Sequence, residues 1–110
     1  MKVKDLISTG IFKVVNEGDS TDTEITKPFC CDLLSIAMSK CSEGCAWVTV
    51  MGNINTLAVA SLTEAAVIVL AENTSLDEPA LNKAKMQGIT VLATELPIFE
   101  AALKIHNLLN

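Results

Sequence analysis

The chain has 110 residues, of which 50% are hydrophobic and 4% aromatic, and its formal net charge is −5. A domain of this length can bury a core, and a surface this acidic repels nucleic acid and anionic membranes. No apolar run reaches the roughly 18 residues that span a bilayer and the start lacks the apolar block of a signal peptide, so we expect one cytoplasmic domain over residues 1–110.

Short structured segments alternate with polar turns in the first third of the chain. A helix is predicted over residues 3–8, and it ends at Gly10, a residue that readily terminates helices. A β-branched strand is predicted over residues 11–15. Residues 24–31 are expected to be extended, and Pro28 favours an edge strand or a bend because proline cannot donate a ladder hydrogen bond. We expect these N-terminal segments to add strands to an edge of a sheet.

A helix and a strand follow this irregular region. Asp32 can cap a helix that runs to about Lys40, because its carboxylate can accept hydrogen bonds from free backbone N–H groups. Residues 46–51 form a continuous apolar run, which is typical of a strand buried on both faces. Either Asn53 or Asn55 can cap the helix that comes next.

The last part of the chain repeats this alternation. Apolar runs predict strands over residues 66–71 and 89–93. Between them, Ser75 begins a capping box and its helix ends at Gly88, and a final helix is predicted from Pro97 to about residue 109. Three apolar strands separated by helices indicate a parallel sheet with right-handed crossovers. The predicted fold is therefore a parallel-sheet-centred α/β/α single domain with an irregular N-terminal strand region.

Polar residues follow each of the three apolar strands. In open parallel sheets, ligands bind at the carboxyl ends of the strands. Gly52 allows close approach of a backbone, whereas Asn53 and Asn55 either contact a polar ligand or serve only as helix caps. The candidate ligand or partner residues at this edge are Gly52, Asn53, Asn55, Glu72, Asn73, Thr94 and Glu95.

Motifs for catalysis or cofactor binding are missing. Neither G-x-x-x-x-G-K-[ST] nor G-x-G-x-x-G occurs, and the five glycines are widely spaced. The one histidine, His106, lies near the end of the last predicted helix, where a protonated imidazole suits the helix dipole. We therefore predict no catalytic residue, no metal site and no cofactor.

Four cysteines need a separate interpretation. Cys30 and Cys31 are adjacent, and Cys41 and Cys45 are four residues apart. Zinc and iron–sulfur sites usually use C-x-x-C pairs, and adjacent cysteines in a strand point to opposite faces. We interpret all four as reduced structural thiols, with metal binding and redox sensing as the alternatives.

An excess of apolar residues points to self-association. The mean hydropathy is +0.43, which is high for a short soluble chain. Surplus apolar surface on a small domain usually lies in a subunit interface, so we expect a homodimer. Trp47 is interpreted as a core or interface anchor.

The order and spacing of several segments resemble the DRTGG domain family, and the resemblance covers nearly the whole chain. The segments that carry it are 32–35, 44–50, 53–60, 66–71, 85–89 and 94–100. The family signature falls at residues 22–29, where Asp22 and Thr26 match. Lys27 and Pro28 stand where the family has two glycines. Thr26 and Asp32, which lie in matched segments, join the candidate site.

The resemblance implies a fold similar to the N-terminal domain of HPr kinase/phosphorylase. It also implies a regulatory, dimer-forming unit of the kind found beside CBS modules in regulated pyrophosphatases, with stand-alone copies in anaerobic bacteria. Some relatives carry a serine kinase label, but this chain lacks a phosphate loop. The first hypothesis is thus a non-catalytic, homodimeric regulatory or scaffold domain that acts through protein partners. The alternative is a small-molecule sensor, for an adenine nucleotide in particular, and a third hypothesis is an enzyme or redox protein that uses the thiols.

Overall fold

The computed structural model describes residues 1–110 and contains five helices and five strands. In chain order they are α1 (Val3–Ser8), β1 (Lys13–Asn16), β2 (Pro28–Cys30), α2 (Leu34–Lys40), β3 (Ala46–Thr49), α3 (Ile54–Thr63), β4 (Val67–Leu70), α4 (Glu78–Gln87), β5 (Val91–Ala93) and α5 (Ile98–Leu109). The strands form one sheet in the order β1-β5-β4-β3-β2. The predicted α/β architecture is confirmed.

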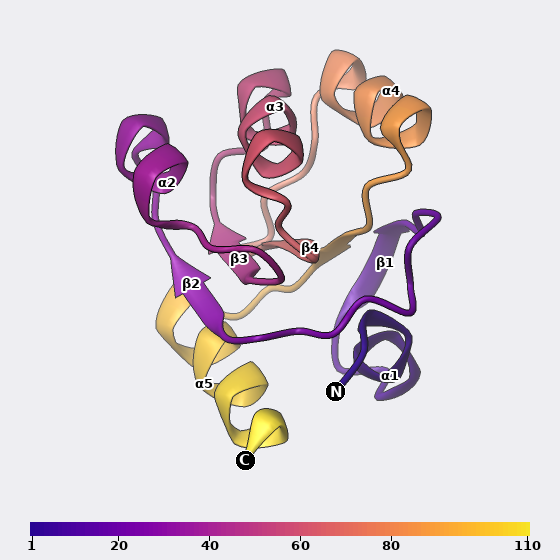
Figure 1. Ribbon diagram of the computed structural model, residues 1–110, viewed down its shortest axis with the longest axis vertical. Coiled ribbons are helices and arrows are strands. Elements are labelled where there is room, and N and C mark those ends of the chain that lie inside the picture. Colours follow the sequence, from indigo (N-terminus) through magenta and orange to yellow (C-terminus); the bar gives the residue numbers. More distant parts are fainter.

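The sheet topology places the helices in two layers. Strands β2, β3, β4 and β5 are parallel and adjacent in chain order, so α2, α3 and α4 are successive crossovers in one direction. Right-handed crossovers that advance in the same direction across a sheet place their helices on the same face. Figure 1 shows these three helices together above the sheet. Helix α5 leaves β5 towards the opposite face and lies there with α1.

Two apolar clusters fill the space between the sheet and its helices. Side chains alternate along each strand, so Trp47 of β3 packs in the cluster under α2, α3 and α4, whereas Val48 packs in the cluster with α1 and α5. Trp47 is fully buried, and its Nε1 donates a hydrogen bond to the Cys31 carbonyl at 2.9 Å. It is therefore a core residue.

The N-terminal strands lie at opposite edges of the sheet, which corrects the expectation of one edge. β1 pairs antiparallel with β5, with Lys13 opposite Ala93, whereas β2 pairs parallel with β3. Pro28 is the first residue of the edge strand β2, as predicted. The chain therefore crosses from one edge to the other between residues 16 and 28 (Figure 1).

Among the predicted ends of α3 and α4, two are confirmed and one is wrong. Asn53 caps α3, because its Oδ1 accepts from the Asn55 and Thr56 N–H groups at 2.9 and 3.3 Å. Gly88 ends α4 with φ of 66°. The cap of α4 is Asp77 and not Ser75: the Asp77 Oδ1 accepts from the Ala80 N–H at 2.9 Å. Both residues fit a cap, and the chain starts its helix at the later one.

The cysteines depart from the expectation of four free thiols. Cys41 and Cys45 are joined by a disulfide, with their Cα atoms 6.4 Å apart. Cys30 and Cys31 are free, and Cys30 is exposed. Three residues that connect α2 to β3 therefore lie inside a covalently closed loop.

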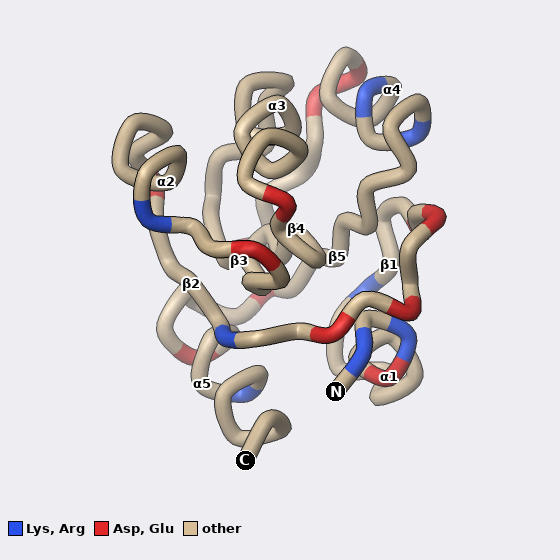
Figure 2. The backbone as a smooth tube through the Cα atoms, viewed as in Figure 1, with Lys and Arg blue, Asp and Glu red and all other residues tan.

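Lysines are dispersed over the surface of the molecule. Figure 2 shows them on both sheet edges and on helices of both layers, with acidic residues between them. No helix combines the length and the apolar character needed to cross a bilayer.

Candidate functional site

A tight turn follows β4 at the carboxyl edge of the sheet. The Thr74 N–H donates to the Ala71 carbonyl at 3.1 Å, and the two residues between them, Glu72 and Asn73, have φ of 57° and 59°. Two successive positive φ values are typical of a type I′ turn. Asparagine tolerates this conformation, but glutamate adopts it at a free-energy cost of about 1 kcal/mol, and such strain is concentrated at functional sites.

This turn is bonded to the loop after β5. The Glu72 N–H donates to the Leu96 carbonyl and the Asn73 N–H to the Thr94 carbonyl, each at 2.9 Å. The Thr94 N–H in turn donates to the Leu70 carbonyl of β4 at 2.9 Å. The two loops therefore form one ordered wall, because backbone hydrogen bonds fix both sides.

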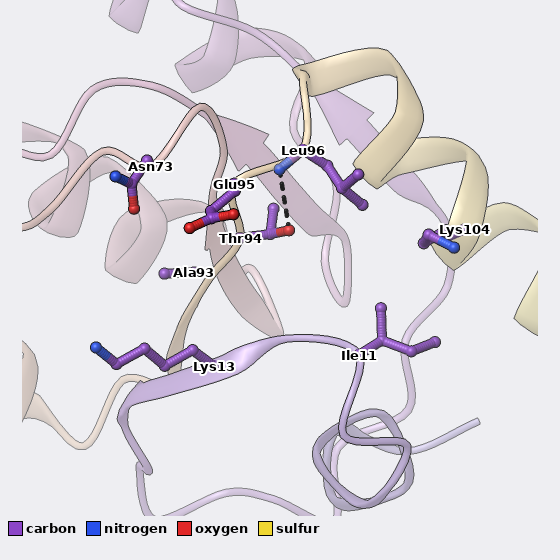
Figure 3. A pocket seen from close by; sticks show the side chains of 8 residues that line it. All are labelled: Ile11, Lys13, Asn73, Ala93, Thr94, Glu95, Leu96 and Lys104. Atoms are coloured by element: carbon purple, nitrogen blue, oxygen red, sulfur yellow. Dashed lines mark hydrogen bonds between the residues drawn. The ribbon is translucent and has the colours of Figure 1, made fainter.

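A pocket of about 500 Å³ opens beside this wall (Figure 3). The chain leaves β4 towards α4 on one face and leaves β5 towards α5 on the other. Ligands in open α/β sheets bind where neighbouring connections diverge in this way. The residues that line the pocket are Ile11, Lys13, Asn73, Ala93, Thr94, Glu95, Leu96 and Lys104.

Charge is distributed unevenly around the pocket. Figure 3 shows Lys13 on the β1 wall and Lys104 on the α5 wall, with Asn73 and Glu95 on the loop wall. The two ion pairs in the structure join the N-terminus to Glu24 and Lys4 to Asp22. Both pocket lysines therefore lack a carboxylate partner, although the chain carries five more negative than positive charges.

A second hollow of about 320 Å³ adjoins the first. Lys13, Asn73 and Ala93 line both, and the second hollow extends to the apolar side chains of Leu76, which precedes α4, and Leu81, which lies in α4. A ligand with a charged part and a flat apolar part could occupy the two hollows together.

Three of the predicted site residues line the pocket. Asn73, Thr94 and Glu95 come together there from two loops, and Glu72 lies next to Asn73 in the turn without lining it. Ile11, Lys13 and Lys104 were not predicted, because their placement depends on the pairing of β1 with β5 and on the path of α5. The candidate site therefore extends beyond the carboxyl edge of the parallel strands.

The residues after β3 have structural contacts instead. The Gly52 carbonyl accepts from the Asp77 N–H at 3.0 Å, and a Cβ on Gly52 would collide with the Ser75 carbonyl. Asn53 caps α3 and Asn55 lies exposed in its first turn. None of the three lines the pocket.

Asp32 was predicted to cap α2, and the structure shows that it does not. Its Oδ1 accepts from the Thr49 Oγ1 at 2.7 Å and from the Val50 N–H at 2.9 Å, and it so joins the end of β2 to the end of β3. The cap position is Leu33, which makes no side-chain cap hydrogen bond.

Thr26 lies at the opposite end of the sheet. Its Oγ1 donates to the Glu43 carbonyl at 3.2 Å, and its N–H donates to the Gly44 carbonyl at 2.9 Å. These contacts join the segment before β2 to the segment before β3. The structure therefore separates Thr26 from the candidate pocket.

Comparison with known proteins identifies the fold. No family model matches the sequence, and no curated protein matches it. The structure is similar to that of the CBS and DRTGG domains of the regulatory region of Clostridium perfringens pyrophosphatase, complexed with the activator diadenosine tetraphosphate. The TM-score is 0.74 at 14% identity, and the match covers 93% of this chain but 44% of that chain. The resemblance noted in the sequence is thus confirmed at the level of the fold.

Proposed function

We propose that this chain, with its DRTGG-like fold, is a regulatory domain that senses a small anionic molecule in the pocket between β4, β5 and β1. The observation that carries the proposal is the pocket itself, which lies where the connections after β4 and β5 diverge. Lys13 and Lys104, unpaired on opposite walls, supply positive charge for an anion. The strained turn at Glu72 and Asn73 supports a site at this place.

An adenine nucleotide is the ligand class that we propose first. The similar solved structure is a regulatory region in complex with a nucleotide activator. Lysine side chains bind phosphate, and the amide of Asn73 and the carboxylate of Glu95 offer hydrogen-bonding groups for a ribose or a base. The adjoining hollow near Leu76 and Leu81 provides apolar surface for a planar ring.

Binding without catalysis fits the contacts of three groups that acid–base chemistry could otherwise use. Asp32 accepts two hydrogen bonds within the fold, Asp77 caps α4, and the His106 ring lies 3.2 Å from the Asn110 side-chain nitrogen. These groups therefore have structural partners outside the pocket. We propose that the domain acts in the cytoplasm by changing its contacts when the ligand binds.

A panel of mono-, di- and triphosphate adenine nucleotides tests the ligand proposal. We expect a rise in melting temperature for at least one of them, because a ligand that binds only the folded state stabilises it. In calorimetry, Lys13→Ala and Lys104→Ala should each lower the affinity for that nucleotide about tenfold, as expected for loss of a charged contact.

The matched control is Lys85→Ala, since Lys85 is exposed on α4 and lines no pocket. It should bind like the unmodified chain. If no nucleotide shifts the melting temperature at millimolar concentration, or if Lys85→Ala weakens binding as much as Lys13→Ala, the nucleotide proposal is wrong.

We further propose that the chain forms a homodimer through the outer surface of α2 and α3. Ile54, Ala58 and Leu62 recur every four residues along α3 and are exposed, so they form one stripe. Leu33 at the cap position of the neighbouring α2 and Ile36 within that helix are exposed as well. Exposed apolar stripes of this kind are typical of subunit interfaces.

Sedimentation velocity at micromolar concentration should give twice the chain mass of 11.7 kDa. Leu62→Glu should yield a monomer, because a carboxylate in a dry interface is not solvated. Phe99→Glu on α5 should stay dimeric: the two side chains are equally exposed, at 68% and 69%, but lie in opposite helix layers. If the unmodified chain sediments as a monomer, the homodimer proposal is wrong. If Phe99→Glu yields a monomer and Leu62→Glu does not, the interface lies on α5 and not on α2 and α3.

A further inference from the structure

The disulfide between Cys41 and Cys45 joins the end of helix α2 to the start of the inner strand β3. Cys41 directly follows α2, and Cys45 directly precedes β3. Cys45 is fully buried and Cys41 is 7% exposed. The covalent bond thus fixes the end of α2 at the point where the fully buried strand β3 begins.

Helix α2 is short, and apart from the bond at its end it is held mainly by packing against α3. It has seven residues, of which Ala37 alone is buried, and its cap position has no side-chain hydrogen bond. Ile36 and Met38 point away from the core, since both are exposed. A helix of two turns is unstable without tertiary contacts, so the position of α2 depends strongly on the bond at its end.

We propose that Cys41 and Cys45 form a reversible thiol–disulfide site, and that its reduction frees α2 from the sheet. A thiolate of a dithiol reductant attacks the Cys41 sulfur, the Cys41–Cys45 bond breaks, and Cys45 leaves as a thiolate that takes up a proton. The second thiol of the reductant, as its thiolate, then attacks the reductant sulfur of the mixed disulfide, so that Cys41 leaves as a thiolate that takes up a proton and the reductant is oxidised to its own disulfide. A low-molecular-weight disulfide oxidant restores the bond by the reverse steps. Two electrons and two protons pass in each direction.

The existing bond and the low reactivity of the other two thiols single out this pair among the four cysteines, although Cys30 is the more exposed. Exchange begins at Cys41, because its residue is the more exposed of the two. Burial raises the pKa of the Cys30 thiol, which lowers its thiolate fraction. The Cys31 thiol donates to the Leu33 carbonyl at 3.3 Å. The proposed exchange therefore does not require Cys30 or Cys31.

Trp47 provides an internal reporter for the state of this bond. It is the only tryptophan, it follows Cys45 by two residues, and it packs in the same apolar cluster as Cys41, Cys45 and Ala37. Release of α2 would admit water to this cluster. The tryptophan emission should then shift to longer wavelength while the β3–β4–β5 core stays folded.

The test compares the unmodified chain under oxidising and reducing conditions. We expect intact mass and alkylation to show one disulfide and two free thiols after equilibration with oxidised glutathione, and four free thiols after dithiothreitol in native buffer. Amide exchange of residues 34–40 should become about tenfold faster on reduction, whereas β4 and β5 keep their protection. The Trp47 emission should shift in the same samples.

Two double variants separate the pair from the other thiols. Cys30→Ser/Cys31→Ser should retain the full redox response, and Cys41→Ser/Cys45→Ser should exchange like the reduced chain under both conditions. Equal protection of α2 in the oxidised and reduced chain would overturn the proposal, as would a bond that resists dithiothreitol in native buffer or four free thiols after oxidation. Because the unmodified chain carries the comparison, a variant that does not fold leaves the test intact.

Discussion

Replacement of Gly52 by alanine should lower the free energy of unfolding by about 3 kcal/mol, at the upper end for overpacking. A Cβ at this position would collide with the Ser75 carbonyl, so the loops after β3 and β4 must move apart. That movement also strains the hydrogen bond from the Asp77 N–H to the Gly52 carbonyl, at the residue that caps α4. Urea denaturation and the thermal midpoint measure the change, and the midpoint should fall by roughly 10 °C or more.

Gly10→Ala is the matched control for this substitution. Gly10 has φ of 70°, but a Cβ there would meet no atom within 4 Å. Its expected cost is therefore about 1 kcal/mol, from the left-handed conformation alone. If Gly52→Ala costs no more than Gly10→Ala, the two loops have room to separate and the close contact does not hold them together.

Asp32→Ala should destabilise the domain by about 2–3 kcal/mol, because hydrogen bonds to a charged group contribute this much. The substitution removes the acceptor for the Thr49 hydroxyl, which is fully buried, and for the Val50 N–H. Asp32→Asn keeps an acceptor oxygen and should cost about 1 kcal/mol. A double-mutant cycle with Thr49→Val should give a coupling energy of about 1 kcal/mol or more.

Thr56 offers a comparison of opposite sign. It is as buried as Thr49, but its Oγ1 has no hydrogen-bond partner. Thr56→Val should therefore raise stability or leave it unchanged, whereas Thr49→Val should lower it. Equal effects of the two valine substitutions would mean that the bond to Asp32 contributes nothing measurable.

The central part of the fold could be predicted because its signals are local. The apolar runs that contain Trp47, Ile68 and Leu92 are strands in the structure, and Gly88 ends a helix as its conformational freedom suggests. Strands buried on both faces need no alternation of polar and apolar residues, so a continuous run identifies them. The parallel order followed from the helices between them.

The pocket could be predicted only in part, because three of its eight lining residues are placed by non-local packing. Asn73 and Glu95 follow buried strands and were expected at the carboxyl edge. Lys13 reaches the same place only because β1 runs antiparallel to β5, and nothing in residues 11–16 specifies that partner. Lys104 lies there because α5 passes to the opposite face, a choice that its own amphipathic pattern does not determine.

Side-chain roles were the least predictable feature. Asp32 fits a helix cap by position, but it accepts instead from a strand residue that is 17 positions away. The spacing of Cys41 and Cys45 argued against a metal site and gave no sign of a bond between them. Such contacts depend on how the chain turns between two elements, which a local pattern does not contain.

Pairing of β1 with β5 also has a consequence during synthesis. Lys13 leaves the ribosome long before Ala93, the residue it will face, and about 80 residues separate the two positions. The nascent segment around β1 must therefore wait, unpaired, until nearly the whole domain has emerged. Closure of a loop of this length is slow because of its entropic cost, so pairing of β1 with β5 should be the last step of folding. The pocket, which β1 helps to line, should form only then.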